Sequence, residues 1–195
     1  MRLTRGLVEV YTGNGKGKTT ASFGLALRAA GWGMHVYILQ FMKLGTYGEN
    51  RGVNNLGELI RLEYVGMPYF IVWEDEYRKG NNGRVANVKV CPRGQPPPEY
   101  RNLAQEAFRK AEEEMLSCRW DVVILDEVNV AIYYGLVDED QVIKMIDEKP
   151  PNTELVMTGR KMPERIMERA DLVTEMVEVK HPFRAGVPAR RGIDF

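Results

Sequence analysis

The residues best suited to chemistry lie near the start of the chain, in the run Thr12–Thr20 (TGNGKGKTT). Its glycines let consecutive backbone N–H groups point toward one anion. Lys18 is placed to reach the β- and γ-phosphates of a nucleotide, and the Thr19 hydroxyl is placed to bind Mg²⁺. The usual pattern has a glycine where this chain has Thr12, so the loop is one residue shorter. The run predicts an ATP site formed by Gly13, Asn14, Gly15, Lys16, Gly17, Lys18, Thr19 and Thr20.

A second chemical signal is the acidic pair Asp126-Glu127, which follows the wholly apolar run Val122–Leu125. In phosphate-loop proteins a carboxylate at the end of such a strand faces the loop and holds Mg²⁺ directly or through water. Two interpretations remain open from the residues alone. One acid could bind the metal while Glu127 activates water or a substrate hydroxyl, as in an ATPase or kinase. Alternatively, both acids belong to a metal site at which nothing is hydrolysed.

The elements that must position these residues alternate along the chain. The expected strands are Leu7–Tyr11, His35–Gln40, Leu59–Val65, Val122–Leu125, Glu154–Thr158 and Leu172–Val179. The expected helices are Thr19–Ala30, Pro98–Cys118, Asn129–Gly135, Asp138–Glu148 and Pro163–Arg169. Such alternation predicts a doubly wound α/β fold with a mostly parallel sheet. The first strand, the glycine-rich run and the first helix form the strand–loop–helix context that a phosphate site requires.

Two segments do not follow this alternation. Residues 66–98 contain five prolines and several glycines, and they are interpreted as a long loop that could hold a hairpin. Long loops in compact domains are usually functional lids or disordered. The helix after this loop is expected to bury Leu103, Ala107, Ala111 and Met115, which lie about one turn apart. Residues 180–195 are interpreted as an irregular C-terminal tail.

The composition of the chain argues against nucleic-acid-binding, secreted and membrane-spanning proteins. Lys and Arg together number 27 and so do Asp and Glu, which gives zero net charge and argues against a nucleic-acid partner. Cys91 and Cys118 match no metal spacing and are expected to be reduced thiols. No apolar run is long enough to span a bilayer, and the first residues do not resemble a secretory leader. We therefore expect a cytoplasmic protein without a membrane partner.

Six segments together resemble the phosphate-loop ATP:corrinoid adenosyltransferases. These are Thr12–Thr20 (TGNGKGKTT), Gln40–Lys43 (QFMK), Leu125–Asn129 (LDEVN), Thr158–Arg160 (TGR), Ala170-Asp171 (AD) and Val179–Phe195 (VKHPFRAGVPARRGIDF). They span nearly the whole chain in the family's order, and the short loop is itself a family feature. The resemblance implies one P-loop NTPase-like (RecA-like) domain over residues 1–195. It also implies that a reduced Co(I) corrinoid attacks the 5′ carbon of ATP and that triphosphate leaves.

The resemblance further implies which residues carry this reaction. Lys16 and Lys18, the catalytic candidates, would stabilise the departing triphosphate together with the loop amides. Mg²⁺, the expected cofactor, would lie between Thr19, the phosphates and a carboxylate, with Glu127 as the nearer ligand and Asp126 as the second.

Further candidates surround this centre. Arg160 is assigned to phosphate or ribose, with a structural salt bridge as the alternative. Arg190 and Arg191 could close over the nucleotide or form a solvated basic patch.

Aromatic side chains are expected over the corrinoid, where the family uses them to displace the lower ligand of cobalt. Phe70 and Trp73 are the candidates, although the family spacing would place an aromatic residue at Ile71. Ordinary core packing is the alternative interpretation of both. The resemblance also implies a homodimer and a partner reductase that delivers the electron. Two other functions stay open: an ATPase or kinase, and a nucleotide-gated corrinoid-binding protein without chemistry.

Overall fold

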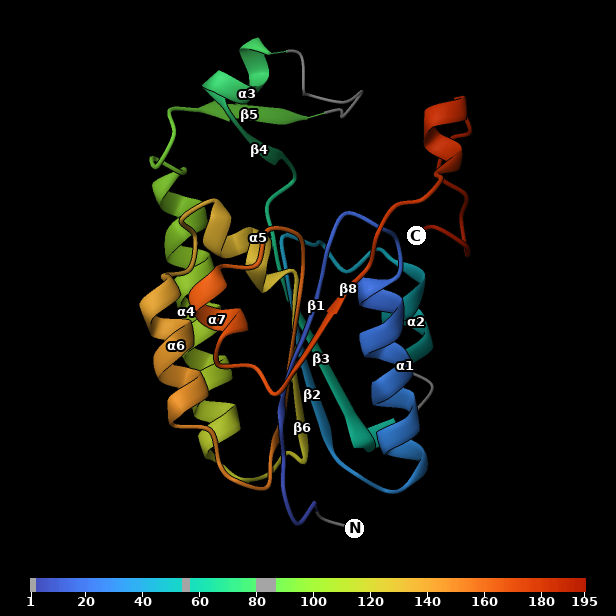
Figure 1. Ribbon diagram of the computed structural model, residues 1–195, viewed down its shortest axis with the longest axis vertical. Coiled ribbons are helices and arrows are strands. Elements are labelled where there is room, and N and C mark those ends of the chain that lie inside the picture. Colours follow the sequence, from blue (N-terminus) through green and yellow to red (C-terminus); the bar gives the residue numbers. More distant parts are fainter. Residues whose placement is uncertain (1–2, 54–56, 80–86) are drawn as a thin grey trace.

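The computed structural model describes residues 3–53, 57–79 and 87–195. Its centre is a sheet of six parallel strands in the order β3-β2-β6-β7-β1-β8 (Figure 1). The strands are β1 (Val8–Thr12), β2 (Val36–Phe41), β3 (Ile60–Val65), β6 (Val122–Asp126), β7 (Glu154–Thr158) and β8 (Leu172–Glu175). All residues of β2 and β6 are buried, as expected for strands covered on both faces. The prediction of a doubly wound α/β fold is confirmed.

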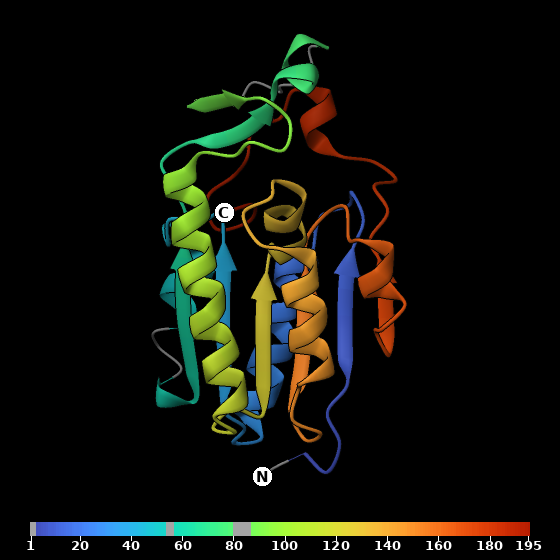
Figure 2. The same cartoon turned by 90° about the vertical axis from the view of Figure 1, so that its left-hand side faces the viewer.

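Helices cover both faces of the sheet (Figures 1 and 2). On one face lie α1 (Lys18–Gly31) and α2 (Gly48–Val53), and on the other α4 (Pro98–Leu116), α5 (Val128–Tyr133), α6 (Glu139–Asp147) and α7 (Glu164–Met167). The buried stripe of α4 begins at Tyr100, Ala104 and Phe108 before it reaches Ala111 and Met115. The prediction that Leu103 belongs to this stripe is wrong, because the stripe steps by three residues between Phe108 and Ala111.

The segment 66–98 has more structure than its composition predicts. It holds β4 (Phe70–Trp73), α3 (Glu74–Arg78) and β5 (Val88–Cys91), while residues 80–86 lie outside the described chain. The two strands do not form the hairpin that this segment could have held, because β4 and β5 pair in parallel. Parallel strands need a crossover between them, and the connection through α3 provides it. Figure 2 shows this unit beyond the carboxyl ends of the central strands.

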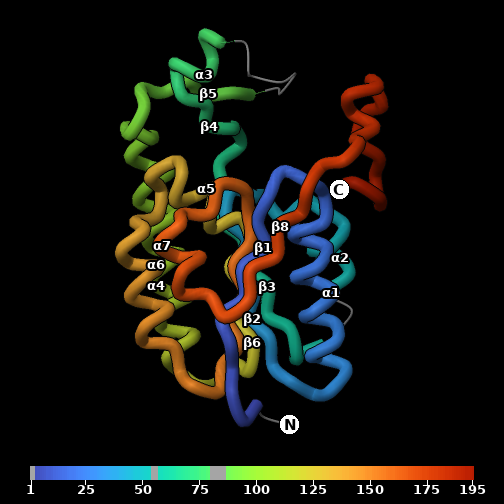
Figure 3. The backbone as a smooth tube through the Cα atoms, in the orientation of Figure 1, coloured from blue at the N-terminus to red at the C-terminus, as the bar shows by residue number. Residues whose placement is uncertain are grey.

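The C-terminal segment leaves the sheet earlier than predicted, since β8 ends at Glu175 and not at Val179. The tail that follows is irregular apart from a short 3₁₀ helix at Pro182–Ala185, and a second such helix, Gly57–Leu59, precedes β3. Figure 3 shows the tail running past the N-terminal end of α1. This course brings residues that are distant in sequence beside the loop between β1 and α1.

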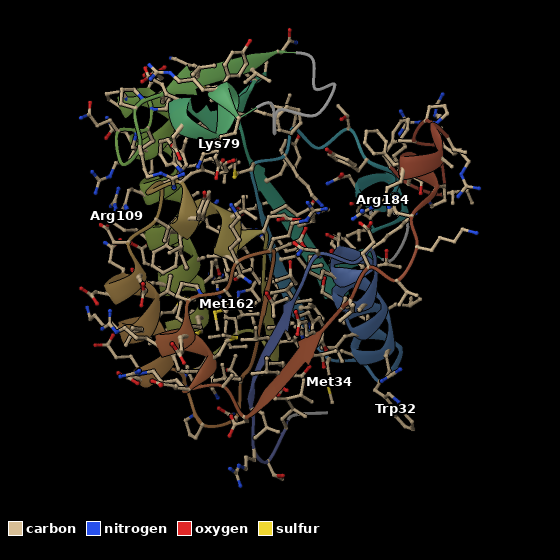
Figure 4. The ribbon with its side chains drawn as sticks, turned by 45° about the horizontal axis from the view of Figure 1, so that its top comes forward. Trp32, Met34, Lys79, Arg109, Met162 and Arg184 are labelled. Atoms are coloured by element: carbon tan, nitrogen blue, oxygen red, sulfur yellow. The ribbon has the colours of Figure 1, made fainter. Side chains whose placement is uncertain are left out.

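Smaller features complete the fold. Gly31 is the last residue of α1, and the left-handed glycine that follows the helix is Gly33, with φ 73°. Beside it Trp32 projects into solvent, whereas Met162 points into the core (Figure 4). Cys91 and Cys118 are both free thiols, as predicted. Within the described ranges, no helix is both long and apolar enough to cross a membrane.

Candidate active site

A cavity of about 730 Å³ opens at the carboxyl ends of the central strands. Four parts of the chain line it: the loop from Asn14 to Thr20, the segment from Lys43 to Glu49, Glu127 with Arg160, and much of the tail from Lys180 to Phe195. In open parallel α/β sheets, ligands bind outside the carboxyl ends of the strands. This cavity therefore coincides with the predicted phosphate loop.

The loop needs its glycines because it lies against the backbone after β8. Gly13 has φ 93° and Gly17 has φ 122°, conformations that side chains rarely adopt. A Cβ atom on Gly13 would lie 2.5 Å from the Met176 carbonyl oxygen. The N–H of Gly15 donates a 2.6 Å hydrogen bond to that same oxygen. The backbone just after β8 thus supports the loop from behind, which the sequence pattern did not indicate.

The two loop lysines have different surroundings. Lys18 is 6% exposed and donates 2.8 Å hydrogen bonds to the carbonyl oxygens of Gly13 and Gly15. Burial lowers the pKa of Lys18, and nearby Glu127 opposes that shift. Lys16 is more exposed and forms an ion pair with Asp194 of the tail. Its ammonium also donates a 2.8 Å hydrogen bond to the carbonyl of Ile193. The tail is therefore bound directly to the phosphate loop.

Asp126 is the hub of a buried polar network at the end of β6. Its side chain is fully buried and accepts hydrogen bonds from Thr19 (2.9 Å), Thr158 (2.6 Å), Gln40 (3.0 Å) and Lys43 (2.9 Å). The strand register explains the contact with Gln40, which is the partner of Asp126 across β2 and β6. These donors match the four lone-pair sites of a carboxylate.

Glu127 takes a different position from its neighbour. Its backbone is left-handed, with φ 61°, and its N–H donates a 3.0 Å hydrogen bond to the Thr158 hydroxyl. The side chain lines the cavity, and burial followed by the charge of Asp126 raises its pKa. The structure thus places Asp126 against Thr19 and Glu127 on the cavity wall. Which of the two acids is the nearer Mg²⁺ ligand remains a prediction.

The donors present fit Mg²⁺ in chemical type, because the Thr19 hydroxyl and the two carboxylates are hard oxygen ligands. Among the described residues, however, no group of three or more His, Cys, Asp or Glu side chains could hold a metal by itself. Mg²⁺ usually keeps waters and is bound through one or two carboxylates and substrate phosphates. The site therefore fits a metal ion that arrives with a nucleotide.

Arg160 and the predicted corrinoid residues lie at the same end of the sheet. Arg160 lines the cavity, as expected from its position after β7. Phe70 is 49% exposed on β4. Trp73 is 1% exposed and packs against Tyr133 and Tyr134 with ring centroids 6.5 and 5.2 Å away. Phe70 is thus accessible to a large ligand, whereas Trp73 would have to leave this cluster to touch one.

Sequence reasoning missed several residues of the site. Lys43 and Gln40 stand in the segment QFMK, and Thr158 begins TGR, yet no role was assigned to them. Apart from these motifs, their signal was a polar residue at or just after the carboxyl end of a buried strand. Asp194 gave no such signal, because its contact with Lys16 spans 178 positions.

The tail arginines differ in position. Both are exposed, but Arg190 lines the cavity and donates a 3.0 Å hydrogen bond from its side chain to Asp194, whereas Arg191 is not one of the lining residues. Closure of either residue over a nucleotide remains a prediction.

A parallel α/β sheet with a glycine-rich loop between β1 and α1, and with a loop threonine bonded to a strand-end carboxylate, defines a P-loop NTPase-like protein. Comparison with known proteins narrows this class. The sequence model of the family described as ATP:corrinoid adenosyltransferase BtuR/CobO/CobP matches residues 4–195. This chain belongs to that family, which is a family of transferases.

Curated relatives agree with this assignment. The corrinoid adenosyltransferase of Escherichia coli (strain K12) is 35% identical over 191 residues, which cover 98% of this chain and 86% of the relative. The corrinoid adenosyltransferase CobA of Salmonella typhimurium is 36% identical, with the same coverage. A corrinoid adenosyltransferase of Sinorhizobium sp is 35% identical over 192 residues, which cover 98% of this chain and 81% of the relative.

Proposed function

We propose that this protein transfers the 5′-deoxyadenosyl group of ATP to the Co(I) of a reduced corrinoid, in cobalamin biosynthesis or salvage. The observation that carries the proposal is the cavity lined by Lys16, Lys18 and Thr19. The Thr19 hydroxyl donates a hydrogen bond to the buried carboxylate of Asp126 behind the cavity wall. This cavity occurs in a chain that belongs to the ATP:corrinoid adenosyltransferase family.

The proposed reaction needs no general base. Co(I) supplies the electron pair for the new cobalt–carbon bond, and the bond between C5′ and the triphosphate oxygen breaks. Its electrons leave with the triphosphate, so the main demands on the protein are orientation and charge stabilisation. Lys18 would exchange the carbonyls of Gly13 and Gly15 for phosphate oxygens, and Lys16 would leave Asp194 for the same purpose. Arg160 lies where it can add a third positive charge.

Mg²⁺ is proposed as the cofactor, held by Thr19 with Asp126 and Glu127. When bound, it would neutralise part of the charge on the triphosphate. The chain's own contribution is a buried and oriented oxygen donor set. Asp126 is positioned by Thr158 and Gln40, and Glu127 is held at the cavity wall by the left-handed turn that begins α5.

The corrinoid is proposed to bind between the cavity and the β4–β5 unit. Phe70 offers an exposed ring for this purpose. The buried indole N–H of Trp73 has no hydrogen-bond partner in the part of the chain that the structure describes. An unsatisfied buried donor costs roughly 1–3 kcal/mol. This cost favours a rearrangement that brings Trp73 toward the corrinoid.

The remaining parts of the proposal concern partners and place of action. We expect a homodimer, a cytoplasmic location and a reductase that supplies the electron for Co(I). Sedimentation of the purified protein tests the first expectation, and a stable active monomer would contradict it.

The deciding experiment is anaerobic. The protein is mixed with Mg·ATP and chemically reduced cob(I)alamin, the visible spectrum is followed, and the phosphate products are assayed. Equal amounts of adenosylcobalamin and triphosphate support the proposal. Release of ADP and phosphate regardless of corrinoid would show an ATPase instead. Corrinoid binding without a cobalt–carbon bond would show a binding protein.

A further inference from the structure

Lys43 holds an unusual position for a residue without an assigned role. Its ammonium lies 2.9 Å from Asp126 Oδ2, 3.4 Å from the Thr19 hydroxyl and 3.4 Å from Glu49 Oε1. It also lies 5.0 Å from the centre of the Tyr47 ring. The first two contacts are with the hydroxyl and carboxylate that we propose for the metal. A positive charge of the chain thus sits on the oxygen donors of a cation site.

The burial of Asp126 explains why a cation is needed beside it. The side chain of Asp126 is fully buried, and a buried carboxylate without a counter-charge is strongly destabilising. Lys43 provides this counter-charge. Its own side chain is only 12% exposed, and its ammonium lies 2.9 Å from Asp126 Oδ2. The two side chains therefore form an internal ion pair.

The same position cannot serve two cations at once. A metal ion bound to Thr19 and Asp126 would meet the ammonium at close range, and like charges a few ångströms apart repel strongly. The four donors on Asp126 already occupy its lone-pair sites. Lys43 is the donor that can leave, because Gln40 and Thr158 belong to strands and Thr19 is itself a proposed ligand.

The surroundings of Lys43 permit such a movement. Its backbone is anchored, since its N–H bonds the Val65 carbonyl at 3.2 Å and Gly66 packs closely against it. The side chain lines the cavity, and Glu49 offers a second carboxylate beside it. Rotation of the flexible four-carbon stem moves the charge without moving the loop.

We propose that Lys43 is a resident stand-in for the divalent cation: its ammonium occupies the position at Asp126 and Thr19 in the nucleotide-free protein and gives way when the metal enters. This inference rests on the proposed function only in that it takes Thr19 and Asp126 as metal ligands. It adds to that function a residue that balances the buried charge of Asp126 until the metal binds.

The test measures Mn²⁺ binding to the nucleotide-free protein by electron paramagnetic resonance of free Mn²⁺. In Lys43→Gln, which keeps a hydrogen-bond donor but removes the charge, Mn²⁺ should bind at least about tenfold tighter than in wild type. Lys43→Arg should resemble wild type. The matched control is Lys18→Gln, which removes a charge from the same cavity but not one that donates to Asp126, and its affinity gain should be much smaller.

Thermal unfolding provides a second measurement in case the variant is unstable. Millimolar Mg²⁺ without nucleotide should raise the melting temperature of Lys43→Gln more than that of wild type, because the metal replaces the missing cation. The inference is overturned if Lys43→Gln gains no Mn²⁺ affinity, if Lys18→Gln gains as much, or if Mg²⁺ does not stabilise the variant. Failure of wild type to bind Mg·ATP would instead count against the proposed function, while the Mn²⁺ comparison would still decide the role of Lys43.

Discussion

Substitution of Gly13 by alanine tests how the phosphate loop is supported. The added Cβ would lie 2.5 Å from the Met176 carbonyl oxygen and 2.8 Å from its nitrogen. Both atoms belong to backbone, and the Met176 N–H is itself bonded to the Thr12 carbonyl at 2.9 Å. Neither can yield without separating the ends of β1 and β8. The substitution should therefore distort the loop itself and not only its surroundings.

The expected loss in the free energy of unfolding is the sum of two costs. A side chain in a left-handed conformation costs about 1–2 kcal/mol, and φ at Gly13 is 93°. Forcing extra volume into a packed site costs typically about 1–3 kcal/mol. The free energy of unfolding of Gly13→Ala should therefore fall by about 2–5 kcal/mol. Because the loop amides move, ATP affinity should also fall by at least about tenfold, which corresponds to about 1.4 kcal/mol.

The assay is urea unfolding followed by circular dichroism, together with ATP titration. Gly24→Ala is the matched control, since it lies in α1 and a Cβ there meets nothing within 4 Å. That variant should gain roughly 0.5–1 kcal/mol from helix propensity and bind ATP normally. If Gly13→Ala unfolds at the same urea concentration as wild type and binds ATP equally well, the argument from the close approach to Met176 is refuted.

Four further predictions concern single residues. Lys18→Ala should slow adenosylation of pre-formed cob(I)alamin by at least about a hundredfold, because charge on the leaving triphosphate loses its partner; a near-normal single-turnover rate would contradict this role. Trp73→Ala should slow the reaction from Co(II) more than the reaction from Co(I), and equal slowing would argue against ligand displacement. Asp194→Asn should tighten ATP binding by no more than about fivefold, because it frees Lys16 from an exposed ion pair; weaker binding in a titration would show that the tail assists the nucleotide. Burial raises the pKa of Glu154 from 4.5 to about 7, so stability present below pH 4.5 should be lost as pH rises through about 7. Urea unfolding at several pH values should show this loss in wild type and a flatter profile in Glu154→Gln.

Much of the fold could be predicted because its signals are local. The apolar run Val122–Leu125 and the alternation of strands and helices indicate a parallel sheet without reference to distant residues. The segment 66–98 was misjudged for the opposite reason. The prolines and glycines of this segment resemble those of a loop. The parallel pairing of β4 with β5 depends on a crossover through α3, which local composition does not indicate. Leu103 was misplaced because a helix face can shift by one residue without changing the overall pattern.

The candidate site likewise has some features that local sequence signals predict and others that they do not. The phosphate loop and the acidic pair were found by their spacing, because a strand end and a glycine turn are properties of neighbouring residues. The positions of Asp126 and Glu127 could not be found in this way. Consecutive residues at a strand end point in different directions, and the left-handed turn at Glu127 sets the second direction.

The sequence by itself determined the class of chemistry: a loop that can surround phosphates, acids that can hold a metal, and motifs in the order of one enzyme family. The tertiary structure decided which side chains meet. It placed Lys43 on Asp126 across 83 positions and Asp194 on Lys16 across 178. It also placed Met176 behind the phosphate loop. Such contacts depend on strand order and on the path of the tail, and the energy of an ion pair depends on distance and burial, neither of which a linear pattern contains.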